Sequence, residues 1–341
     1  MARSAKSGVR KTDAPALDGN LSARSAVARN GQPLSYSRAP APDLAPWVAR
    51  VYVSSVALPP GHVLSCGLFG ETSALRIQLD GDWVAQGARG TIARGRSTLL
   101  FGPQSRRMPV SVSGGFTSLG ILFRPGAVRV LGGPSERDTV DTIFDLADVG
   151  GHPDRWLSRI RPNDDAETMC LRMEQTLRAM IAERGSGTPD PVSAWFEQVS
   201  YANPSIPMAQ CAEEGGIEMR RLERIVRRDF GVTPKHVMRR ARALDMASHL
   251  RGIADPDEAE ALMLRYYDQS HLIRDFTALI GMSPRQFVER PQPLMVLTLE
   301  TRQARRLEML ERIAPGETPP WLDRGFVALP AGADGPIGLD G

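Results

Sequence analysis

The chain has 341 residues, of which 42% are hydrophobic and 24% are charged, and its formal net charge is +3. This length allows two domains of ordinary size, and the composition is typical of a folded protein rather than a disordered one. No apolar stretch approaches the ~20 residues needed to span a bilayer, and the basic N-terminus lacks the apolar core of a secretory signal. Cys66, Cys170 and Cys211 are far apart and show no zinc-type spacing, so we expect a cytoplasmic protein without membrane contact.

The first 39 residues differ in composition from the rest of the chain. Residues 1–39 carry seven Lys or Arg residues against two Asp residues and show almost no periodic pattern of large apolar residues. Such a composition predicts a disordered basic tail. A solvated segment is one interpretation of this tail, and additional non-specific attraction to phosphates is the other.

Residues 40–150 contain short apolar runs separated by glycine and proline, such as 51–56, 74–79, 98–101 and 119–123. Turn signals, including Asp80-Gly81-Asp82 and Gly114-Gly115, lie between the runs. Runs of this length at this spacing predict an all-β sandwich or barrel, not alternating strands and helices. We therefore expect a β domain in this region.

Residues 166–184 repeat apolar side chains at intervals of three and four, which predicts one face of a helix: Met169, Met173, Leu177, Met180 and Ile181. This face must be buried, either against the β domain or against a second copy of the chain in a homodimer. The Gly- and Pro-rich residues 185–191 then predict a linker. The stretch 151–191 thus joins the β domain to a mainly helical part.

A shift of fifty residues aligns the C-terminal part of the chain with itself. The aligned positions are Leu222 with Leu272, Arg224 with Arg274, Gly231 with Gly281, and Thr233-Pro234-Lys235 with Ser283-Pro284-Arg285. A repeated helical unit indicates that one supersecondary element is used twice. Shorter predicted helices, 207–214 and 257–264, precede the two copies, and a tight Gly215-Gly216 joins the first pair. Each copy therefore predicts a helix-turn-helix.

Helical geometry divides each repeated helix into an inner and an outer face. In the first copy, Leu222, Ile225 and Val226 gather opposite the outer residues Arg220, Arg224 and Arg227. In the second copy the outer stripe is Ser270, Arg274 and Thr277. A single stripe also fits a solvated helix face, but the repetition favours a phosphate-binding surface.

The charge between residues 216 and 242 supports this interpretation, because nine Lys or Arg residues stand there against three acidic residues. Concentrated positive charge beside a helix-turn-helix is typical of DNA binding. The segment 236–251 predicts a connecting helix. A stiff connection can hold two recognition helices about 34 Å apart, so that one protomer reads two successive major-groove segments of double-stranded DNA.

Two longer motifs contain these features. The first is Arg220-Arg221-Leu222-Glu223-Arg224 with Gly231-Val232-Thr233-Pro234-Lys235, and the second is the run 267–276 with Gly281-Met282-Ser283-Pro284-Arg285-Gln286-Phe287. Together they resemble the AraC/XylS family of bacterial transcription regulators. The resemblance covers residues 192–290, and Glu218 departs from it where the family usually has a helix-capping serine.

The resemblance implies an α+β protein. An N-terminal β-barrel or cupin-like domain, residues 40–150, would serve effector sensing or dimerisation. An all-α domain, residues 192–290, would contain two helix-turn-helix units joined by a linker helix. The tail, residues 291–341, is expected to be partly disordered, although 294–310 suits one more helix.

The resemblance also implies which residues contact DNA. In the family, bases are contacted from the exposed start of each recognition helix, which corresponds here to Arg220, Glu223 and Arg224, then Gln269, Ser270, His271 and Arg274. Arginine suits guanine, glutamine suits adenine, and Glu223 suits a cytosine amine. Lys235 and Arg285 follow prolines at predicted helix starts and suit phosphate contacts, and Arg227 and Thr277 complete the outer stripes. His271 has a structural role as its alternative.

Activation is the commoner outcome in the family, and it would make RNA polymerase a partner. The sequence leaves open a homodimer and a small-molecule effector, and it names no effector-binding residues.

No catalytic motif is evident in the sequence. The histidines, His62, His152, His236, His249 and His271, are scattered without HxH or HExxH spacing, and nucleotide-binding glycine motifs are absent. We therefore expect no enzyme activity, no metal and no cofactor. The competing interpretations are a cupin-type small-molecule enzyme whose helices only pack or dimerise, and a protein-interaction adaptor that binds no DNA.

Overall fold

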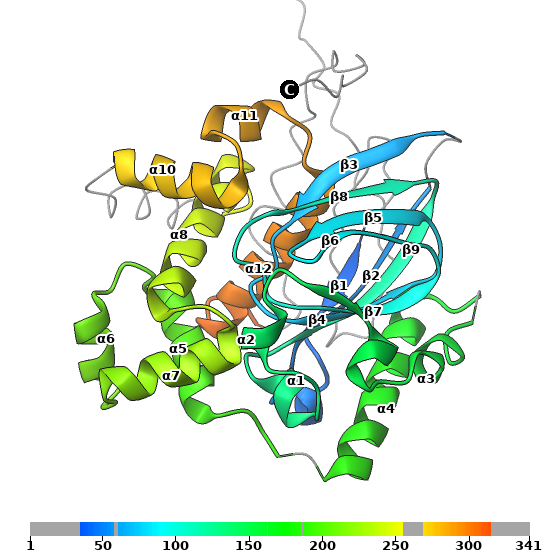
Figure 1. Cartoon of the computed structure of the whole chain (residues 1–341), viewed down its shortest axis with the longest axis horizontal. Helices are drawn as coiled ribbons and strands as arrows, with labels where there is room; N and C mark the ends of the chain where they lie inside the picture. The colour runs from blue at the N-terminus through cyan, green and yellow to red at the C-terminus, as the bar shows by residue number, and fades with distance from the viewer. Residues whose placement is uncertain (1–34, 58–60, 162, 186, 255–268, 315–341) are drawn as a thin grey trace, which may run out of the picture.

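The computed structural model describes residues 35–57, 61–161, 163–185, 187–254 and 269–314 (Figure 1). A β part and a helical part lie side by side, with the sheets on one side of the molecule and most of the helices on the other. The predicted α+β organisation is confirmed.

The β part consists of two antiparallel sheets. The first has six strands in the order β1 (Tyr36–Arg38), β2 (Val48–Val56), β9 (Phe116–Phe123), β4 (Ala74–Gln78), β7 (Ser97–Phe101) and β10 (Ile143–Asp145). The second has four strands in the order β3 (Val63–Leu68), β8 (Met108–Ser113), β5 (Asp82–Gly87) and β6 (Gly90–Arg94). Within the described residues no strand pairing joins the two sheets, so the β part is not a closed barrel.

The outer face of the six-stranded sheet is covered by α4 (Ala166–Arg184), whose bounds agree with the predicted helix. Val51 and Ile121 of the sheet share one buried cluster with Met173 and Leu177 of α4. The apolar stripe of this helix therefore packs on the β part, which was one of the two interpretations, and it is not a free surface for a second copy.

The chain enters the first sheet through β1, which pairs with β2. Arg38 is only 2% exposed, and its guanidinium donates hydrogen bonds to Glu174 of α4 at 2.8 and 3.1 Å. The predicted disordered tail of residues 1–39 is therefore too long at its C-terminal end, because 36–38 form a strand. Residues 1–34 lie outside the described residues. A three-residue strand is too short for its periodicity to be recognised in the sequence.

Short helices accompany the strands of the β part, and longer ones form the helical part. The short elements are the 3-10 turns η1 (Pro42–Leu44) and η2 (Leu146–Val149) and the helices α1 (Ala127–Val130), α2 (Glu136–Thr139) and α3 (Pro153–Leu157). The longer helices are α5 (Pro191–Ala202), α6 (Met208–Glu214), α7 (Met219–Phe230), α8 (Pro234–Leu250), α10 (Gln269–Ile280), α11 (Pro284–Glu289) and α12 (Pro293–Met309). The helix expected over 257–264 lies outside the described residues.

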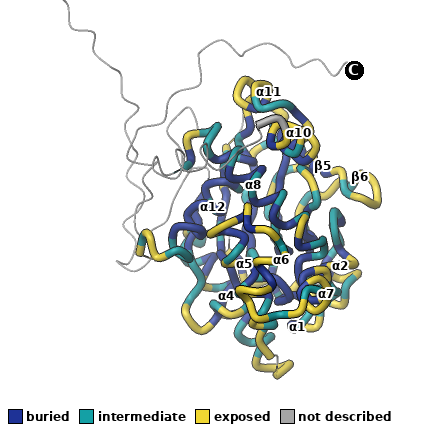
Figure 2. The backbone as a smooth tube through the Cα atoms, turned by 90° about the vertical axis from the view of Figure 1, so that its left-hand side faces the viewer, coloured by how far each residue is buried: buried dark blue, intermediate teal, exposed yellow. Residues whose placement is uncertain are grey.

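Helix α12 connects the two parts of the molecule. Leu294 and Leu299 share a buried cluster with Trp83 of β5 and Leu244 of α8. Figure 2 shows α8 and α12 largely as buried backbone. The predicted helix within the C-terminal tail is therefore present, and it belongs to the core that the two parts share.

One arginine of α12, Arg302, forms ion pairs with the loop before β4 and with α8. The Arg302 guanidinium lies 2.8 Å from a carboxylate oxygen of Glu71, in the loop before β4, and 2.5 Å from one of Asp245 in α8. The side chain of Arg302 is 4% exposed. Burial disfavours its charge, but Asp245 and Glu71 outweigh burial and hold the pKa of Arg302 above its usual range.

Replacing Arg302 should destabilise the whole fold. Arg302→Ala leaves the buried Asp245 and the half-buried Glu71 without their cation, a loss that costs about 3–5 kcal/mol at buried ion pairs. The melting temperature should fall accordingly in thermal unfolding followed by circular dichroism. The matched control is Arg94→Ala, which breaks an exposed pair with Asp145 and should cost about 1 kcal/mol or less. Equal losses in the two variants would contradict this account of α12.

Candidate DNA-binding surface

Helix α7 has the two faces that its sequence predicts. Leu222, Ile225 and Val226 are buried, whereas Arg220, Glu223, Arg224 and Arg227 are exposed. The helix begins after Glu218, whose side chain makes no capping hydrogen bond, as expected from its departure from the usual serine. It ends at Gly231, whose φ of 76° lies in the left-handed region that glycine tolerates.

A tight turn connects α6 to α7. Gly216 has a φ of 56°, and a Cβ at Gly215 would lie 2.4 Å from the Trp195 ring of α5. Both glycines are therefore needed, one for its backbone angle and one for the close approach of α5. This arrangement is the turn of the first predicted helix-turn-helix.

Helix α10 repeats the pattern of α7. Leu272, Phe276 and Leu279 are buried, and His271, Arg274 and Thr277 are exposed. The Thr277 hydroxyl donates to the Ile273 carbonyl at 2.8 Å. Gln269 and Ser270 form the start of the helix, but their side chains lie outside the description.

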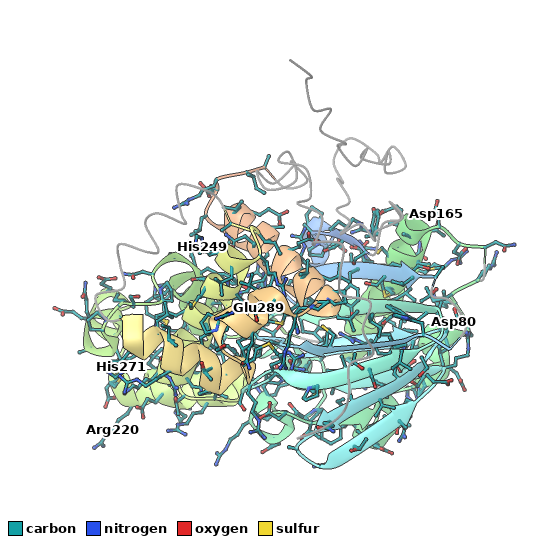
Figure 3. All side chains as sticks on the ribbon, turned by 90° about the horizontal axis from the view of Figure 1, so that it is seen from above. Asp80, Asp165, Arg220, His249, His271 and Glu289 are labelled. Carbon is teal, nitrogen blue, oxygen red and sulfur yellow. The ribbon has the colours of Figure 1, made fainter. Side chains whose placement is uncertain are left out.

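The two helices are presented from one side of the molecule. Figure 1 shows α7 and α10 on the side away from the sheets, with α8 between them, and Figure 3 shows Arg220 and His271 at the same end of the protein. The Arg239 guanidinium of α8 donates to Asp275 of α10 at 2.7 and 3.0 Å. This pair helps to fix α10 to the connecting helix.

Both residues predicted to contact phosphates are exposed at helix starts. Lys235 follows Thr233, whose hydroxyl accepts from the His236 amide, and Arg285 follows Ser283 in a capping box with Gln286. Arg285 also pairs with Glu289 one helical turn later, at 2.7 Å. This neighbour reduces the charge that Arg285 presents.

The local excess of positive charge is only partly available to a ligand. Arg228 pairs with Asp190 and Asp229, and Arg242 joins Arg239 beside Asp275. Arg240 is 1% exposed and donates to the carbonyls of Gln104 and Glu71, each at 2.7 Å. Four of the nine cations are thus used inside the protein, and the exposed ones are Arg220, Arg221, Arg224, Arg227 and Lys235.

A cleft of about 560 Å³ runs along the exposed face of α7, and its other wall is α2 of the β part. Ser135, which caps α2, donates from its hydroxyl to the Arg228 carbonyl at 3.2 Å. Arg137 and Asp138 of α2 face the same cleft as Arg220 and Arg224. Sequence reasoning missed this contact, because the two helices are some ninety residues apart and neither carries a motif for the other.

A protein-family profile described as a helix-turn-helix domain matches residues 211–290, which run from α6 to the end of α11. Residues 211–290 form an AraC-type helix-turn-helix domain. Such domains bind DNA in transcription regulators, so this part of the chain is a DNA-binding domain. No curated protein sequence matches the chain.

Three solved structures are similar to this chain at low sequence identity. ToxT from Vibrio cholerae is 10% identical, with a TM-score of 0.42, over 70% of this chain and 97% of that chain. The C-terminal domain of AraT, a response regulator from Geobacillus stearothermophilus, is 18% identical, with a TM-score of 0.28, over 31% and 90%. The AraC-like transcriptional activator CuxR is 14% identical, with a TM-score of 0.25, over 62% and 86%. The assignment of the domain rests on the family profile.

The described residues form neither a metal-binding cluster nor a membrane-spanning helix. Among the described residues, no group of three or more His, Cys, Asp or Glu side chains is placed to hold a metal ion. In the same residues, no helix is long and apolar enough to cross a membrane. His236, one of the scattered histidines, lies 2.9 Å from the Ser105 carbonyl and so connects the AraC-type domain to the β part.

A buried carboxyl group lies where α2 approaches the AraC-type domain. Glu136 is 2% exposed, and its Oε1 accepts from the Gly126 amide at 3.1 Å. Burial raises the pKa of Glu136 to about 8, and the negative charge of nearby Asp229 contributes to the rise. The group is therefore mostly protonated at neutral pH in the folded protein.

Glu136 should make the fold less stable as the pH rises. Folding raises the pKa of Glu136 from 4.5 to about 8, so the folded state binds this proton more tightly than the unfolded state does. The stability that the bound proton contributes is full below about pH 4.5 and is lost as the pH rises through 8. The loss approaches about 1.4 kcal/mol per pH unit in this window. Glu136→Gln keeps a neutral side chain, so its melting temperature should exceed that of the wild type increasingly from pH 5 to pH 9.

The control for this titration is Glu213→Gln, because Glu213 is an exposed carboxylate at the end of α6. Its profile of melting temperature against pH should run parallel to that of the wild type. If the Glu136→Gln profile also ran parallel, the raised pKa would be wrong.

Proposed function

We propose that the chain is a sequence-specific transcription regulator whose helices α7 and α10 read two successive major-groove segments. The observation that supports this most strongly is the exposure of Arg224 and Arg274 at equivalent positions of two helices on one side of the molecule. The repetition supplies two readers, and α8 supplies a packed connection between them. Successive major grooves lie about 34 Å apart along one face of B-DNA. The relative position of α7 and α10 therefore determines which two groove segments one protomer can contact.

The residue types suggest a division of roles. Arg220, Arg224 and Arg274 suit guanine O6 and N7, Gln269 suits adenine, and Glu223 suits a cytosine amine. We assign further base-edge or backbone contacts to Ser270, His271, Arg227 and Thr277, and phosphate contacts to Lys235 and Arg285. Lys235 is the stronger of the two phosphate contacts, because Glu289 neutralises part of the charge of Arg285.

We also propose partners besides DNA. We assign activation to the regulator, as its sequence resemblance implies, with RNA polymerase as the partner and the cytoplasm as the compartment. We also assign it a small-molecule effector held in the β part and no catalytic step. A homodimer would have to use a face other than the apolar stripe of α4, because that stripe packs on the sheet.

Substitutions in the two recognition helices should weaken specific binding. After genome-wide mapping identifies a bound site, Arg224→Ala and Arg274→Ala should each reduce affinity by roughly 5- to 150-fold, the equivalent of about 1–3 kcal/mol per base contact. Fluorescence anisotropy with the mapped duplex measures the change. Arg155→Ala is the control, because Arg155 lies in α3 and pairs with Glu183. Wild-type affinity in both recognition-helix variants would refute the assignment of these helices.

The salt dependence of binding tests the phosphate contact. Lys235→Ala should weaken binding to specific and unrelated duplexes by similar factors, and it should reduce the slope of log affinity against log salt concentration by about 0.9. Lys235→Arg keeps the charge and should leave the slope unchanged. An unaltered slope in Lys235→Ala would exclude this residue from the interface, and a complex without salt dependence would favour the adaptor interpretation.

A further inference from the structure

A cavity of about 120 Å³ lies between the two sheets of the β part. Its walls come from the inner face of the six-stranded sheet, from Trp83 and Phe116, and from α12, which contributes Leu297 and Thr301. The volume is slightly smaller than the ~150 Å³ cavity that accommodates benzene in an engineered protein core. The cavity therefore suits a ligand of a few non-hydrogen atoms and not a long chain.

The sheet presents polar side chains to this cavity, which is unusual for the interior of a packed β structure. Tyr52 of β2 and Arg76 of β4 both pair with Gly120 of β9, so the three residues form one row across neighbouring strands. A Cβ at Gly120 would lie 2.2 Å from the Tyr52 ring. The outer end of the ring, with its hydroxyl, therefore lies over Gly120, the residue that pairs with Arg76 on the next strand.

Arg76 differs from the other charged residues of the cavity. Arg302 pairs with Glu71, and Arg305 pairs with Glu197. Within the described part of the chain, Arg76 has no ion pair, and its guanidinium carbon lies 4.6 Å from the centre of the Phe101 ring. Stacking on a ring holds the guanidinium in place and leaves its N–H groups to bind a ligand.

Neighbouring polar atoms in the cavity also have no hydrogen-bond partner among the described residues. These atoms are the Tyr52 hydroxyl, the Ser118 hydroxyl and Arg76 Nε, all of them buried. A buried polar atom without a partner destabilises the fold, because it loses its hydrogen bonds to water. A ligand that accepts hydrogen bonds from this group would remove that cost.

The rest of the cavity is apolar and aromatic. Trp83 and Phe116 meet edge to face, with ring centres 4.8 Å apart, and Leu68 and Leu122 lie beside them. One end of the cavity thus suits hydrocarbon, and the row of Tyr52, Gly120 and Arg76 suits a planar anion.

We propose that this cavity binds a small organic monoanion of roughly the size of propionate or butyrate, with its carboxylate on Arg76 and Tyr52 and its apolar body against Trp83 and Phe116. This inference names the chemical class of the effector and rests on the proposed function only for its regulatory role. Ligand binding is measured without DNA, so the two can fail separately.

The first test compares acids with their neutral amides on the full-length protein. Isothermal titration calorimetry with propionate, butyrate, propionamide and butyramide should show at least one acid binding, and its amide should bind at least roughly 10-fold more weakly, because charge-assisted hydrogen bonds are lost. Equal binding of an acid and its amide would overturn the proposal. Absence of binding by both acids up to about 10 mM, beyond the range of a specific site, would also overturn it.

The second test uses variants. Arg76→Gln should weaken binding of the acid by roughly 10- to 100-fold. Arg89→Gln is the matched control, because Arg89 also stacks on a phenylalanine, Phe144, at 4.6 Å, but is exposed and outside the cavity. It should bind the acid like the wild type, and retention of wild-type affinity in Arg76→Gln would refute the site.

A third variant keeps the proposal testable if Arg76→Gln does not fold. Tyr52→Phe preserves the ring over Gly120 and removes a hydroxyl that has no partner among the described residues, so its melting temperature should not fall. Its affinity for the acid should nevertheless decrease several-fold. Unchanged affinity would show that the hydroxyl does not bind the carboxylate and would overturn the proposed geometry.

Discussion

The arrangement of the molecule depends on the buried ion pairs of Arg302. This side chain joins a loop of the β part through Glu71 to the connecting helix of the DNA-binding domain through Asp245. Removing charges from water is costly, and the cost is recovered only when every partner is in place. The ion pairs therefore select one relative position of sheet, α8 and α12, which apolar packing alone would define less sharply.

The helices α4, α7 and α10 could be predicted closely from the sequence, because a helix with one buried face repeats its apolar residues every three or four positions. The bounds of α4, the buried face of α7 around Leu222 and the exposed positions of Arg224 and Arg274 all follow from that period. The repeat at fifty residues then made the second unit recognisable even though the helix expected before α10 lies outside the described residues.

Other features could not be predicted, since they depend on residues that are distant in the sequence. The count of nine cations between 216 and 242 did not show that Arg228, Arg239, Arg240 and Arg242 have partners inside the protein. Asp275 and Gln104 supply two of those partners, and neither follows a recognisable pattern. The same limitation applies to the approach of α2 to α7, which places part of the candidate surface beside the β part.

The strands show a second limit of what the sequence alone can predict. The run 51–56 was recognised as an apolar strand, and its alternate residues Val51 and Val53 do pack under α4. The residues between them, Tyr52 and Ser54, face the cavity instead. Alternation shows that a strand has two different faces, but it does not show whether the polar face meets solvent or encloses a ligand.

The position of α12 also limits how this protein can be divided. Its sequence follows the DNA-binding domain, yet its side chains complete a cavity in the β part. A chimaera that replaced the β part of this protein at residues 185–191 would therefore give the new β part a foreign helix as one wall of its cavity. The β part and the DNA-binding domain are consecutive in the sequence but are not interchangeable modules.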